Sequence, residues 1–434
     1  MALHVMEVAN HCLGCKKPRC QEGCPIHTNI PEVIRLLKDG KLNEAGWTLF
    51  ENNPLTTVCS LVCNHEAQCE GHCVQGIKGS PVHFSIIENY ISTTYANQMT
   101  AGPKEWNGKK AAVIGAGPSG ITIAIILARY GYKVTIFDTR DKIGGVMRYG
   151  IPDFRLPDSV LDDLKYRHLD LKGIEFRPNT NIGSALTIDD LFRDGYLSIF
   201  VGAGLWKPRK LNIRGESLGN VTYAINYLAS PEAYKIGERV MVIGVGNAAM
   251  DCARTAIRMG ARYVTCVARG DQVRASQYEA SYAKLEGVEF LMNKCTLELR
   301  EDGAVLADSV KNEEGRTVPQ EGSEKLYPCD FIVIAVSQEA ESNLVSTTKG
   351  IDTAKGGLLS VDEEGHTSRA GVFAAGDMVN GARTVVEAVA NGKRVAEAMH
   401  EYMQGLEVPV MTDYPDAPRV EPKDVSVLNE QVIG

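Results

Sequence analysis

The chain has 434 residues, a formal net charge of −8 and a hydrophobic fraction of 44%. At about 150 residues per domain, this length predicts roughly two to four domains. The negative charge argues against a nucleic-acid-binding surface. The longest apolar stretch, 123–128, is far shorter than the ~18 residues that span a membrane. Residues 1–7 lack the basic and apolar regions of a secretory signal, so we expect a cytoplasmic protein without disulfides.

Cysteines are concentrated near the amino terminus, where eight of the 12 lie within the first 73 residues. Apolar residues at helical spacing predict one helix at 31–50, between two groups of cysteines, and a second helix at 83–95. The first group is Cys12, Cys15, Cys20 and Cys24, and the second is Cys59, Cys63, Cys69 and Cys73.

Closely spaced thiolates bind either zinc or iron–sulfur clusters. Four-sulfur zinc sites usually consist of two Cys-x2–4-Cys pairs. The ending Cys20-x3-Cys24-Pro25 instead matches the last element of the bacterial ferredoxin pattern. The spacing therefore favours iron–sulfur clusters, with zinc as the alternative.

A run at 99–110 that contains glycine and proline predicts a linker. After it, short apolar strands alternate with helices, which is typical of parallel sheets with crossover helices. Two βαβ units are predicted at 110–138 and 238–269. Further predicted elements are strands at 198–202, 331–336 and 372–375, a last helix at 384–403 and an extended tail at 408–434.

The first βαβ unit contains a G-x-G-x-x-G fingerprint made of Gly115, Gly117 and Gly120, with Pro118 and Ser119 between them. Such glycines permit a tight turn that brings a pyrophosphate to a helix N-terminus. The next strand ends at Asp138, whose carboxylate can accept hydrogen bonds from a ribose. We predict dinucleotide binding here. The alternative is a tight strand-to-helix turn without a ligand.

The second βαβ unit carries Gly244 and Gly246, followed by Asn247 and Ala248, at the equivalent turn. Its second strand ends at Arg269 and not at an acid. An arginine at this place suits the 2′-phosphate of NADPH. The alternative is a solvent-exposed arginine without a role.

A third junction lies near the C-terminus, where Gly376 and Asp377 end a strand and Thr384 and Val385 begin a helix. This pattern suits the ribityl chain and a phosphate of FAD, although Asp377 could simply cap a turn. Two dinucleotide units fit a flavin enzyme that takes hydride from a nicotinamide, with FAD in the first unit and NAD(P)H in the second. A flavin can release its electrons singly to iron–sulfur clusters, whereas zinc accepts none. A thioredoxin-reductase type is disfavoured, because no Cys-x-x-Cys follows residue 73.

Longer motifs carry a resemblance to a known family. The segments 12–25, 51–55, 144–157 and 376–377 resemble the small subunit of NADPH-dependent glutamate synthase. The same module recurs in the N-terminal half of dihydropyrimidine dehydrogenase and in the flavin subunit of the electron-bifurcating NADH-dependent ferredoxin:NADP oxidoreductase. The resemblance covers roughly residues 4–404 and implies that Gly145 and Val146 contact FAD.

The resemblance also implies two [4Fe-4S] clusters. Glu88 takes the place of the last ligand, where some relatives have Gln, and its alternative is an exposed helix acid. Cys59 is expected to be a spare thiol near the site. Gly270 replaces a second arginine of many NADPH-using relatives, which leaves NADH and NADPH both open, and Ser337 replaces a usual glycine without a functional interpretation. The implied ligands are Cys12, Cys15, Cys20 and Cys73 for one cluster, and Cys24, Cys63, Cys69 and Glu88 for the other.

We therefore predict an α/β fold with glutathione-reductase-like tandem dinucleotide-binding domains, preceded by a helical iron–sulfur domain. Hydride from NAD(P)H would reach FAD, and single electrons would leave through the clusters to a separate subunit, without a catalytic acid or base. The expected partner resembles the large subunit of glutamate synthase, the catalytic subunit of dihydropyrimidine dehydrogenase, or a ferredoxin-linked protein. The alternatives are the flavin subunit of a dihydropyrimidine dehydrogenase or of a bifurcating transhydrogenase, and a zinc-stapled scaffold that only binds nucleotides. The predicted domains are 1–104 (iron–sulfur), 105–236 and 341–407 (two parts of the FAD domain), 237–340 (NAD(P)) and 408–434 (tail).

Overall fold

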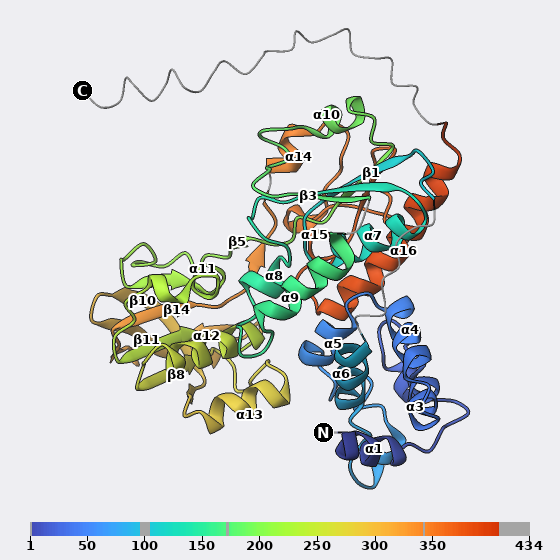
Figure 1. Ribbon diagram of the computed structural model, residues 1–434. Coiled ribbons are helices and arrows are strands. Elements are labelled where there is room, and N and C mark those ends of the chain that lie inside the picture. Colours follow the sequence, from blue (N-terminus) through green and yellow to red (C-terminus); the bar gives the residue numbers. More distant parts are fainter. Residues whose placement is uncertain (1, 96–104, 171–172, 342, 408–434) are drawn as a thin grey trace, which may run out of the picture.

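The computed structural model describes residues 2–95, 105–170, 173–341 and 343–407 (Figure 1). Helices build the described part of the cysteine-rich region, and two parallel sheets with flanking helices dominate the described residues after it. This arrangement confirms the predicted α/β fold with a helical N-terminal part. Within the described ranges, no helix is both long enough and apolar enough to cross a membrane. The predicted tail and the first half of the predicted linker, residues 99–104, lie outside the described residues.

The N-terminal part is a cluster of short helices. The single helix predicted at 31–50 is wrong, because two helices form there and the chain turns at Gly40. Gly40 has a φ of +72°. The N–H of Lys41 donates to the carbonyl of Leu36 at 2.9 Å and that of Gly40 to Leu37 at 3.1 Å, which is the Schellman ending of a helix. The helix predicted at 83–95 is confirmed. The elements are α1 (Ala2–Asn10), α2 (Arg19–Glu22), α3 (Ile30–Lys38), α4 (Leu42–Asn52), α5 (Thr56–Val62), η1 (Val74–Ile77) and α6 (Phe84–Tyr95).

The first sheet has five parallel strands in the order β16-β4-β1-β2-β3. Its edge strand β16 comes from the end of the chain, so two distant segments build one nucleotide-binding unit. The strands predicted at 198–202 and 372–375 and the last helix are confirmed. The strands are β1 (Lys110–Ile114), β2 (Lys133–Phe137), β3 (Ile174–Arg177), β4 (Ser198–Val201) and β16 (Val372–Ala374). The helices are α7 (Pro118–Arg129), α8 (Val146–Tyr149), α9 (Asp158–Leu164), η3 (Lys165–Leu169), α10 (Ile188–Arg193), α14 (Asn343–Thr347), η5 (Lys355–Gly357), α15 (Asp377–Asn380) and α16 (Val385–Gln404).

The second unit is built around another parallel sheet, in the order β6-β14-β7-β8-β9. The predicted strand at 331–336 is its strand β14, between β6 and β7. The strands are β6 (Val221–Tyr223), β7 (Arg239–Ile243), β8 (Tyr263–Val267), β9 (Glu289–Leu291) and β14 (Phe331–Ile334), and the helices are α11 (Ala224–Ala229), η4 (Pro231–Ala233), α12 (Asn247–Arg258) and α13 (Gln277–Leu285). An antiparallel sheet is added by β10 (Lys294–Arg300), β11 (Gly303–Lys311), β12 (Thr317–Pro319) and β13 (Lys325–Pro328).

The chain passes between the two units along a pair of short antiparallel strands, β5 (Lys207–Pro208) and β15 (Gln338–Glu339). The predicted domain boundaries stay a prediction. Because β6 pairs with β14 in the second sheet, we propose that the second unit begins after β5 and not at residue 237.

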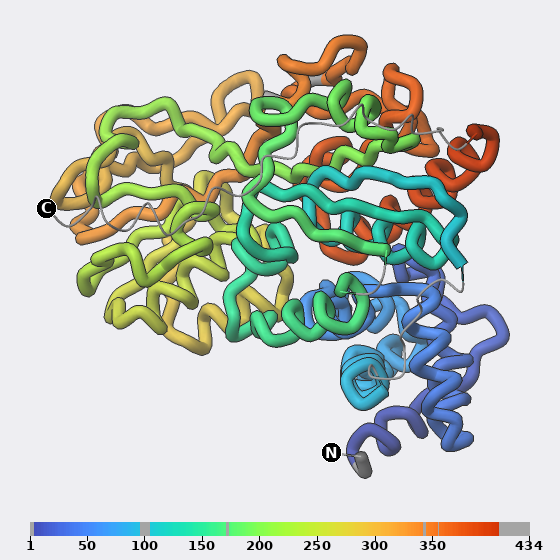
Figure 2. Tube along the Cα trace, turned by 45° about the horizontal axis from the view of Figure 1, so that its top comes forward, coloured from blue at the N-terminus to red at the C-terminus, as the bar shows by residue number. Residues whose placement is uncertain are grey.

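The N-terminal helices lie against the first unit, below its sheet in both views (Figure 2). Nζ of Lys393 on α16 donates to the backbone carbonyl and to Oδ1 of Asn52 at the end of α4, both at 2.7 Å. The ring of Phe50 stacks on His168, with the ring centroids 4.7 Å apart. These contacts hold the cysteine-rich helices next to the first nucleotide-binding unit.

Candidate functional site

The first glycine fingerprint forms a tight turn between β1 and α7. Gly115 has a φ of +104°, and a Cβ added there would lie 2.3 Å from the carbonyl oxygen of Gly202. At Gly120 an added Cβ would lie 2.0 Å from the oxygen of Gly115, so helix and strand pack too closely for any side chain. A Cβ at Gly117 would meet no protein atom within 4 Å. Gly117 therefore presents open space at the N-terminus of α7, where a pyrophosphate binds in this motif.

Asp138 follows β2 and closes the same turn. Its carboxylate accepts hydrogen bonds from the backbone N–H of Ala116 at 2.6 Å and of Arg140 at 2.8 Å. Burial raises the pKa of Asp138, while these N–H groups lower it. Each carboxylate oxygen retains a lone pair for a ribose hydroxyl, as the predicted role requires.

A cavity of about 620 Å³ connects the predicted flavin residues, and its size is typical of a cofactor site. Both glycine fingerprint regions and the Gly376–Val385 junction contribute to its wall, although they are up to 270 residues apart in the chain. The predicted flavin residues that line it are Gly115, Gly117, Pro118, Ser119, Asp138, Gly145, Val146, Gly376, Asp377, Thr384 and Val385. Gly120 does not line the cavity, and its role is to let α7 pack closely against the turn at Gly115.

Asp377 and the N-terminus of α16 line the cavity beside the first fingerprint, where the Ser119 hydroxyl donates to the carbonyl of Ala388 on α16. Burial raises the pKa of Asp377 to about 6, although the N–H of Arg383 donates to its carboxylate. Thr384 caps α16, because its hydroxyl accepts from the N–H of Glu387 while the Glu387 carboxylate accepts from the N–H of Thr384. The cap leaves the positive end of a 20-residue helix at the cavity, where the helix dipole favours a negatively charged ligand group.

The second fingerprint repeats this geometry between β7 and α12. Gly244 has a φ of +138°, and a Cβ there would lie 2.3 Å from the carbonyl oxygen of Ala335. Gly246 is open in the same way as Gly117. Asn247 and Ala248, at the start of α12, line the same cavity as the flavin residues, whereas Gly244 and Gly246 stand outside it. The start of α12, which follows the second fingerprint, therefore borders the cavity that the first fingerprint lines.

Arg269 follows β8 and is exposed to solvent. It does not line the cavity. Its carbonyl accepts a hydrogen bond from the Ser309 hydroxyl at 2.8 Å, and no contact of its guanidinium is found among the described residues. The end of the second strand is where the ribose or 2′-phosphate of a nicotinamide dinucleotide binds in this type of unit, so the position suits the predicted role.

The cysteines of the first implied ligand set converge although Cys73 is far from the other three in the sequence. Burial raises the pKa of the Cys20 thiol to about 11, and the neighbouring thiols raise it further, that of Cys73 most strongly. A single cavity between α2, α3 and the loop before η1 is lined by Cys12, Cys15, Cys20 and Cys73. Cys69 also borders this cavity, and the other four thiols fit the donor set of a [4Fe-4S] cluster.

The second implied ligand set, Cys24, Cys63, Cys69 and Glu88, is more deeply buried. Cys24 and Cys69 are buried, and the thiol of Cys63 lies beside Cys59, which together with burial raises the pKa of Cys63 well above its usual value. Burial also raises the pKa of Cys69, and Glu88 raises it further. The Cys63 and Cys69 thiols thus lie near Glu88 and near each other, the Cys24 thiol lies near Cys69, and Cys59 is adjacent to Cys63.

Glu88 is 6% exposed, so its alternative interpretation as an exposed helix acid is wrong. Burial raises its pKa to about 7, and the Thr56 hydroxyl donates to its Oε1 at 2.7 Å. A buried carboxylate without a cationic partner is rare. A cluster iron would supply the missing positive charge, so the residues present fit a second [4Fe-4S] cluster.

The cysteine-rich helices and the flavin cavity touch directly. Val62, the residue before Cys63, lines the flavin cavity. Cys69, from the second implied ligand set, also lines the cavity of the first set. The flavin cavity, the second set and the first set are therefore consecutive neighbours.

Several residues of the cavity were not among the predicted site residues. Arg155 and Asp251 lie at the boundary of the two units. Arg155 belongs to the family-like motif at 144–157, whereas no sequence motif pointed to Asp251. The others include Val62, Asn181, Trp206, Arg383 and Glu387. Glu387 could have been found from the Thr384-x-x-Glu387 capping box, whereas the others line the cavity through tertiary contacts that have no local sequence pattern.

Comparison with known proteins agrees with this arrangement. The family model for dihydropyrimidine dehydrogenase domain II, 4Fe-4S cluster, matches residues 2–100. The model for pyridine nucleotide-disulphide oxidoreductase matches residues 179–392, and that for the NAD(P)-binding Rossmann-like domain matches residues 113–162.

Curated relatives match over nearly the whole chain. The glutamate synthase [NADPH] small chain of Azospirillum brasilense is 35% identical, covering 93% of this chain and 90% of that protein. The Escherichia coli small chain is 32% identical, covering 91% of each. The NAD-dependent dihydropyrimidine dehydrogenase subunit PreT of Escherichia coli is 30% identical, covering 93% of this chain and 95% of that protein.

Solved structures with the same fold are more distant. Mycobacterium tuberculosis FprA in complex with NADPH has a TM-score of 0.58 at 17% identity, covering 68% of this chain and 84% of that one. Lactococcus lactis thioredoxin reductase has a TM-score of 0.53 at 22% identity, covering 69% of this chain and 100% of that one. The chain belongs to the glutamate synthase small-chain family, as an NAD(P)H-dependent FAD oxidoreductase with a 4Fe-4S domain that transfers electrons to a partner subunit.

Proposed function

We propose that this chain is the electron-input subunit of an enzyme whose terminal reaction takes place on a separate polypeptide. FAD, when bound, accepts a hydride and can release its two electrons one at a time. Residues of the chain bind and orient the cofactors, and no acidic or basic side chain is needed for proton transfer. The observation that carries the proposal is the position of Val62, which belongs to the flavin cavity and directly precedes the cluster ligand Cys63.

The proposed ligand sets keep the predicted allocation. Cys24, Cys63, Cys69 and Glu88 hold the cluster nearer the flavin cavity, and Cys12, Cys15, Cys20 and Cys73 hold the one farther away. Cys69 supports this order, because it is a ligand of the inner cluster and still lines the cavity of the outer one. The outer site would then be the point at which electrons leave or enter the chain.

The surface around the outer site has the composition of a docking site. Leu13 and Ile77 are 65% and 66% exposed, which is unusual for large apolar side chains. Leu13 lies in the loop after α1 and Ile77 ends η1, and these segments are neighbours because Nε2 of Gln75 in η1 donates to the carbonyl of His11 at 2.9 Å. Four exposed cationic residues lie within six positions of them in the sequence, although the whole chain has a net charge of −8: Lys16, Lys17, Arg19 and Lys78. We propose that an acidic surface of the partner subunit binds here.

The experiment uses the full chain together with its co-purified partner under anaerobic conditions. Cys20→Ser and Cys63→Ser are expected to abolish electron transfer to the partner, while reduction of FAD by NAD(P)H, followed by stopped-flow absorbance, continues. Cys59→Ser is the matched control and is expected to leave both steps unchanged. Partner-directed transfer at the wild-type rate in Cys20→Ser or Cys63→Ser would contradict the proposed route.

A second candidate is supported by one comparison. The match to the dihydropyrimidine dehydrogenase subunit PreT covers 95% of that protein, so the terminal reaction could be pyrimidine reduction in place of glutamate synthesis. A ferredoxin-linked bifurcating enzyme remains the other alternative. Mass spectrometry of the co-purified subunit separates these candidates, since each requires a different partner. The cytoplasmic location stays a prediction.

A further inference from the structure

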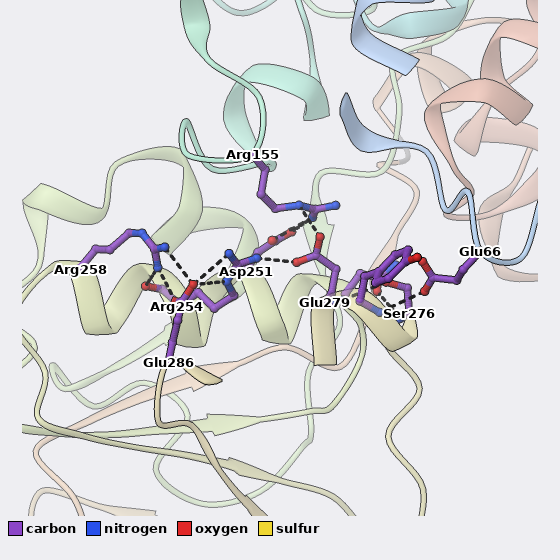
Figure 3. A network of polar contacts seen from close by, with 10 residues as sticks. Glu66, Arg155, Asp251, Arg254, Arg258, Ser276, Glu279 and Glu286 are labelled. Atoms are coloured by element: carbon purple, nitrogen blue, oxygen red, sulfur yellow. Dashed lines mark hydrogen bonds and ion pairs between the residues drawn. The ribbon is translucent and has the colours of Figure 1, made fainter. Parts of the chain in front are cut away.

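A chain of charged side chains crosses the boundary between the two nucleotide-binding units (Figure 3). We propose that Arg155 is a positioning residue, which holds the nicotinamide-binding unit at one fixed orientation to the flavin-binding unit and so sets the distance for hydride transfer. The proposal concerns the reaction of NAD(P)H with FAD and does not depend on the identity of the partner subunit.

Arg155 belongs to the first unit, in the segment between α8 and α9, but its side chain binds to the second unit. Its Nη1 donates to both carboxylate oxygens of Asp251 on α12, at 2.9 and 2.8 Å. Its Nε lies 2.9 Å from Oε1 of Glu279 on α13. The side chains of Arg155 and Asp251 are only 14% and 5% exposed. One guanidinium therefore joins two helices of the other unit in a nearly buried position, where removal of one partner leaves an unpaired charge.

The carboxylates that receive Arg155 are themselves held in place. Nη1 of Arg254 lies 2.7 Å from Oε2 of Glu279, and its Nη2 lies 3.0 Å from Oε1 of Glu286. Arg254 belongs to α12, Glu279 to the first turn of α13, and Glu286 directly follows α13. Figure 3 shows these side chains together. The second unit thus offers Arg155 a fixed acidic binding site, hereafter the receptor, because Arg254 already orients Glu279.

Phe154 adds an apolar contact beside this receptor. Its ring lies under the guanidinium groups of Arg254 and Arg258, at 4.7 and 3.8 Å from the ring centroid. This attraction requires each guanidinium to lie over the face of the ring, close to its centre. Phe154 and Arg155 together restrict both sliding and rotation of the second unit.

The location of this contact connects it to the reaction. Arg155 and Asp251 both line the cavity that contains Gly117 of the flavin fingerprint and Asn247 of the nicotinamide fingerprint. Asp251 stands one helical turn after Asn247 on α12, the helix whose N-terminus receives the dinucleotide. By fixing Asp251, Arg155 fixes that helix end relative to the flavin.

The iron–sulfur part is tied to the same receptor. Oε1 of Glu66, from the loop between Cys63 and Cys69, accepts a hydrogen bond from the N–H of Tyr278 at 3.1 Å. Tyr278 immediately precedes Glu279 on α13. All three parts of the chain therefore meet at α13, and rotation of the second unit would break contacts to both of the others.

The test uses the FAD- and cluster-loaded full chain. Arg155→Gln is expected to retain FAD but to reduce flavin at least tenfold more slowly in anaerobic stopped-flow experiments with NADH and NADPH. The long-wavelength charge-transfer absorbance of nicotinamide stacked on flavin is expected to disappear. Arg155→Lys, which can reach one acid but not both, is expected to recover part of the rate. Arg239→Gln is the matched control, because Arg239 pairs with Asp330 at 2.6 Å within the second unit alone, and is expected to react like the wild type.

A double variant separates positioning from simple stability. Arg155→Gln with Asp251→Asn removes the unpaired charge, so its melting temperature is expected to return toward the wild-type value, while flavin reduction stays slow and the charge-transfer absorbance stays absent. Recovery of the rate together with the melting temperature would show that Arg155 is only structural. A wild-type rate in the single variant, with FAD content unchanged, would equally overturn the proposal. The double variant also provides the measurement if the single variant does not fold.

Discussion

The hydroxyl of Thr56 donates a hydrogen bond of 2.7 Å to Oε1 of Glu88, which joins α5, the helix that leads to Cys63, to the buried carboxylate on α6. Thr56 thereby fixes the orientation of Glu88 and leaves its second oxygen, Oε2, without this partner. A hard oxygen ligand that is oriented by a neighbouring hydrogen bond is typical of metal sites.

Replacing Glu88 with alanine is therefore expected to remove the fourth ligand of the inner cluster. Anaerobically purified wild-type chain should contain about eight irons, as two [4Fe-4S] clusters require, and Glu88→Ala fewer, because the iron that Glu88 would hold loses its protein ligand. Glu88→Gln should retain its iron, because the amide oxygen can replace the carboxylate. Iron and acid-labile sulfide analysis provides the measurement. Cys59→Ser is the control, and loss of iron in this variant but not in Glu88→Ala would identify Cys59 as the ligand.

Gly117 and Gly120 of the first fingerprint are expected to respond differently to alanine. At Gly120 the new Cβ would lie 2.0 Å from the oxygen of Gly115, so helix α7 has to move away from the sheet, and overpacking of this kind typically costs about 1–3 kcal/mol. At Gly117, whose φ is −81°, the Cβ meets only the open cavity. Gly117→Ala should therefore fold normally and lose affinity for FAD.

Thermal unfolding and the ratio of FAD to protein test this pair together. Gly120→Ala is expected to have a lower melting temperature than the wild type even when FAD is added in excess. Gly117→Ala is expected to match the melting temperature of the flavin-free wild type. Full FAD content in Gly117→Ala would remove Gly117 from the binding site.

The backbone conformation of Ser337 accounts for a departure from the family that had no interpretation in the sequence. It has a φ of +100°, a region that glycine adopts without strain and other residues rarely do. Its carbonyl accepts from the N–H of Arg209 at 3.1 Å, where the chain crosses between the two units, so the conformation is fixed by a tertiary contact. The glycine that is usual in relatives would adopt this backbone conformation without strain.

Ser337→Gly is accordingly expected to increase the free energy of unfolding by about 1 kcal/mol, because strain of this kind costs roughly 1–3 kcal/mol and glycine loses more chain entropy. Urea unfolding measures the difference. The control is Ser230→Gly, because Ser230 has a φ of −158° and gains nothing from glycine. Equal destabilisation by both substitutions would show that Ser337 is not strained.

The parts that could be predicted from sequence are those with local patterns. Both fingerprints, the strands around them and the capped helix α16 follow from glycine spacing and apolar alternation. The turn at Gly40 was missed, because apolar residues continue at helical spacing on both sides of it. The burial of Glu88 depends on Thr56, which is 32 residues away, and the pairing of Arg155 with Asp251 spans 96 residues. Neither contact leaves a periodic pattern, so only the fold reveals them.

The choice between NADH and NADPH depends on Arg269. The end of β8 places this exposed guanidinium where a 2′-phosphate binds in this type of unit, and Gly270 beside it provides no second charge. A charge-assisted hydrogen bond of roughly 1.5–3 kcal/mol is expected from one arginine. Arg269→Ala should therefore lower kcat/KM for NADPH about tenfold or more and leave that for NADH unchanged. Flavin reduction at varied concentrations of each nucleotide supplies both values, with Arg262→Ala, an exposed arginine at the opposite end of β8, as the control. An unchanged ratio of the two kcat/KM values would mean that Arg269 has no part in selectivity and that backbone contacts of the β8–α13 loop recognise the ribose.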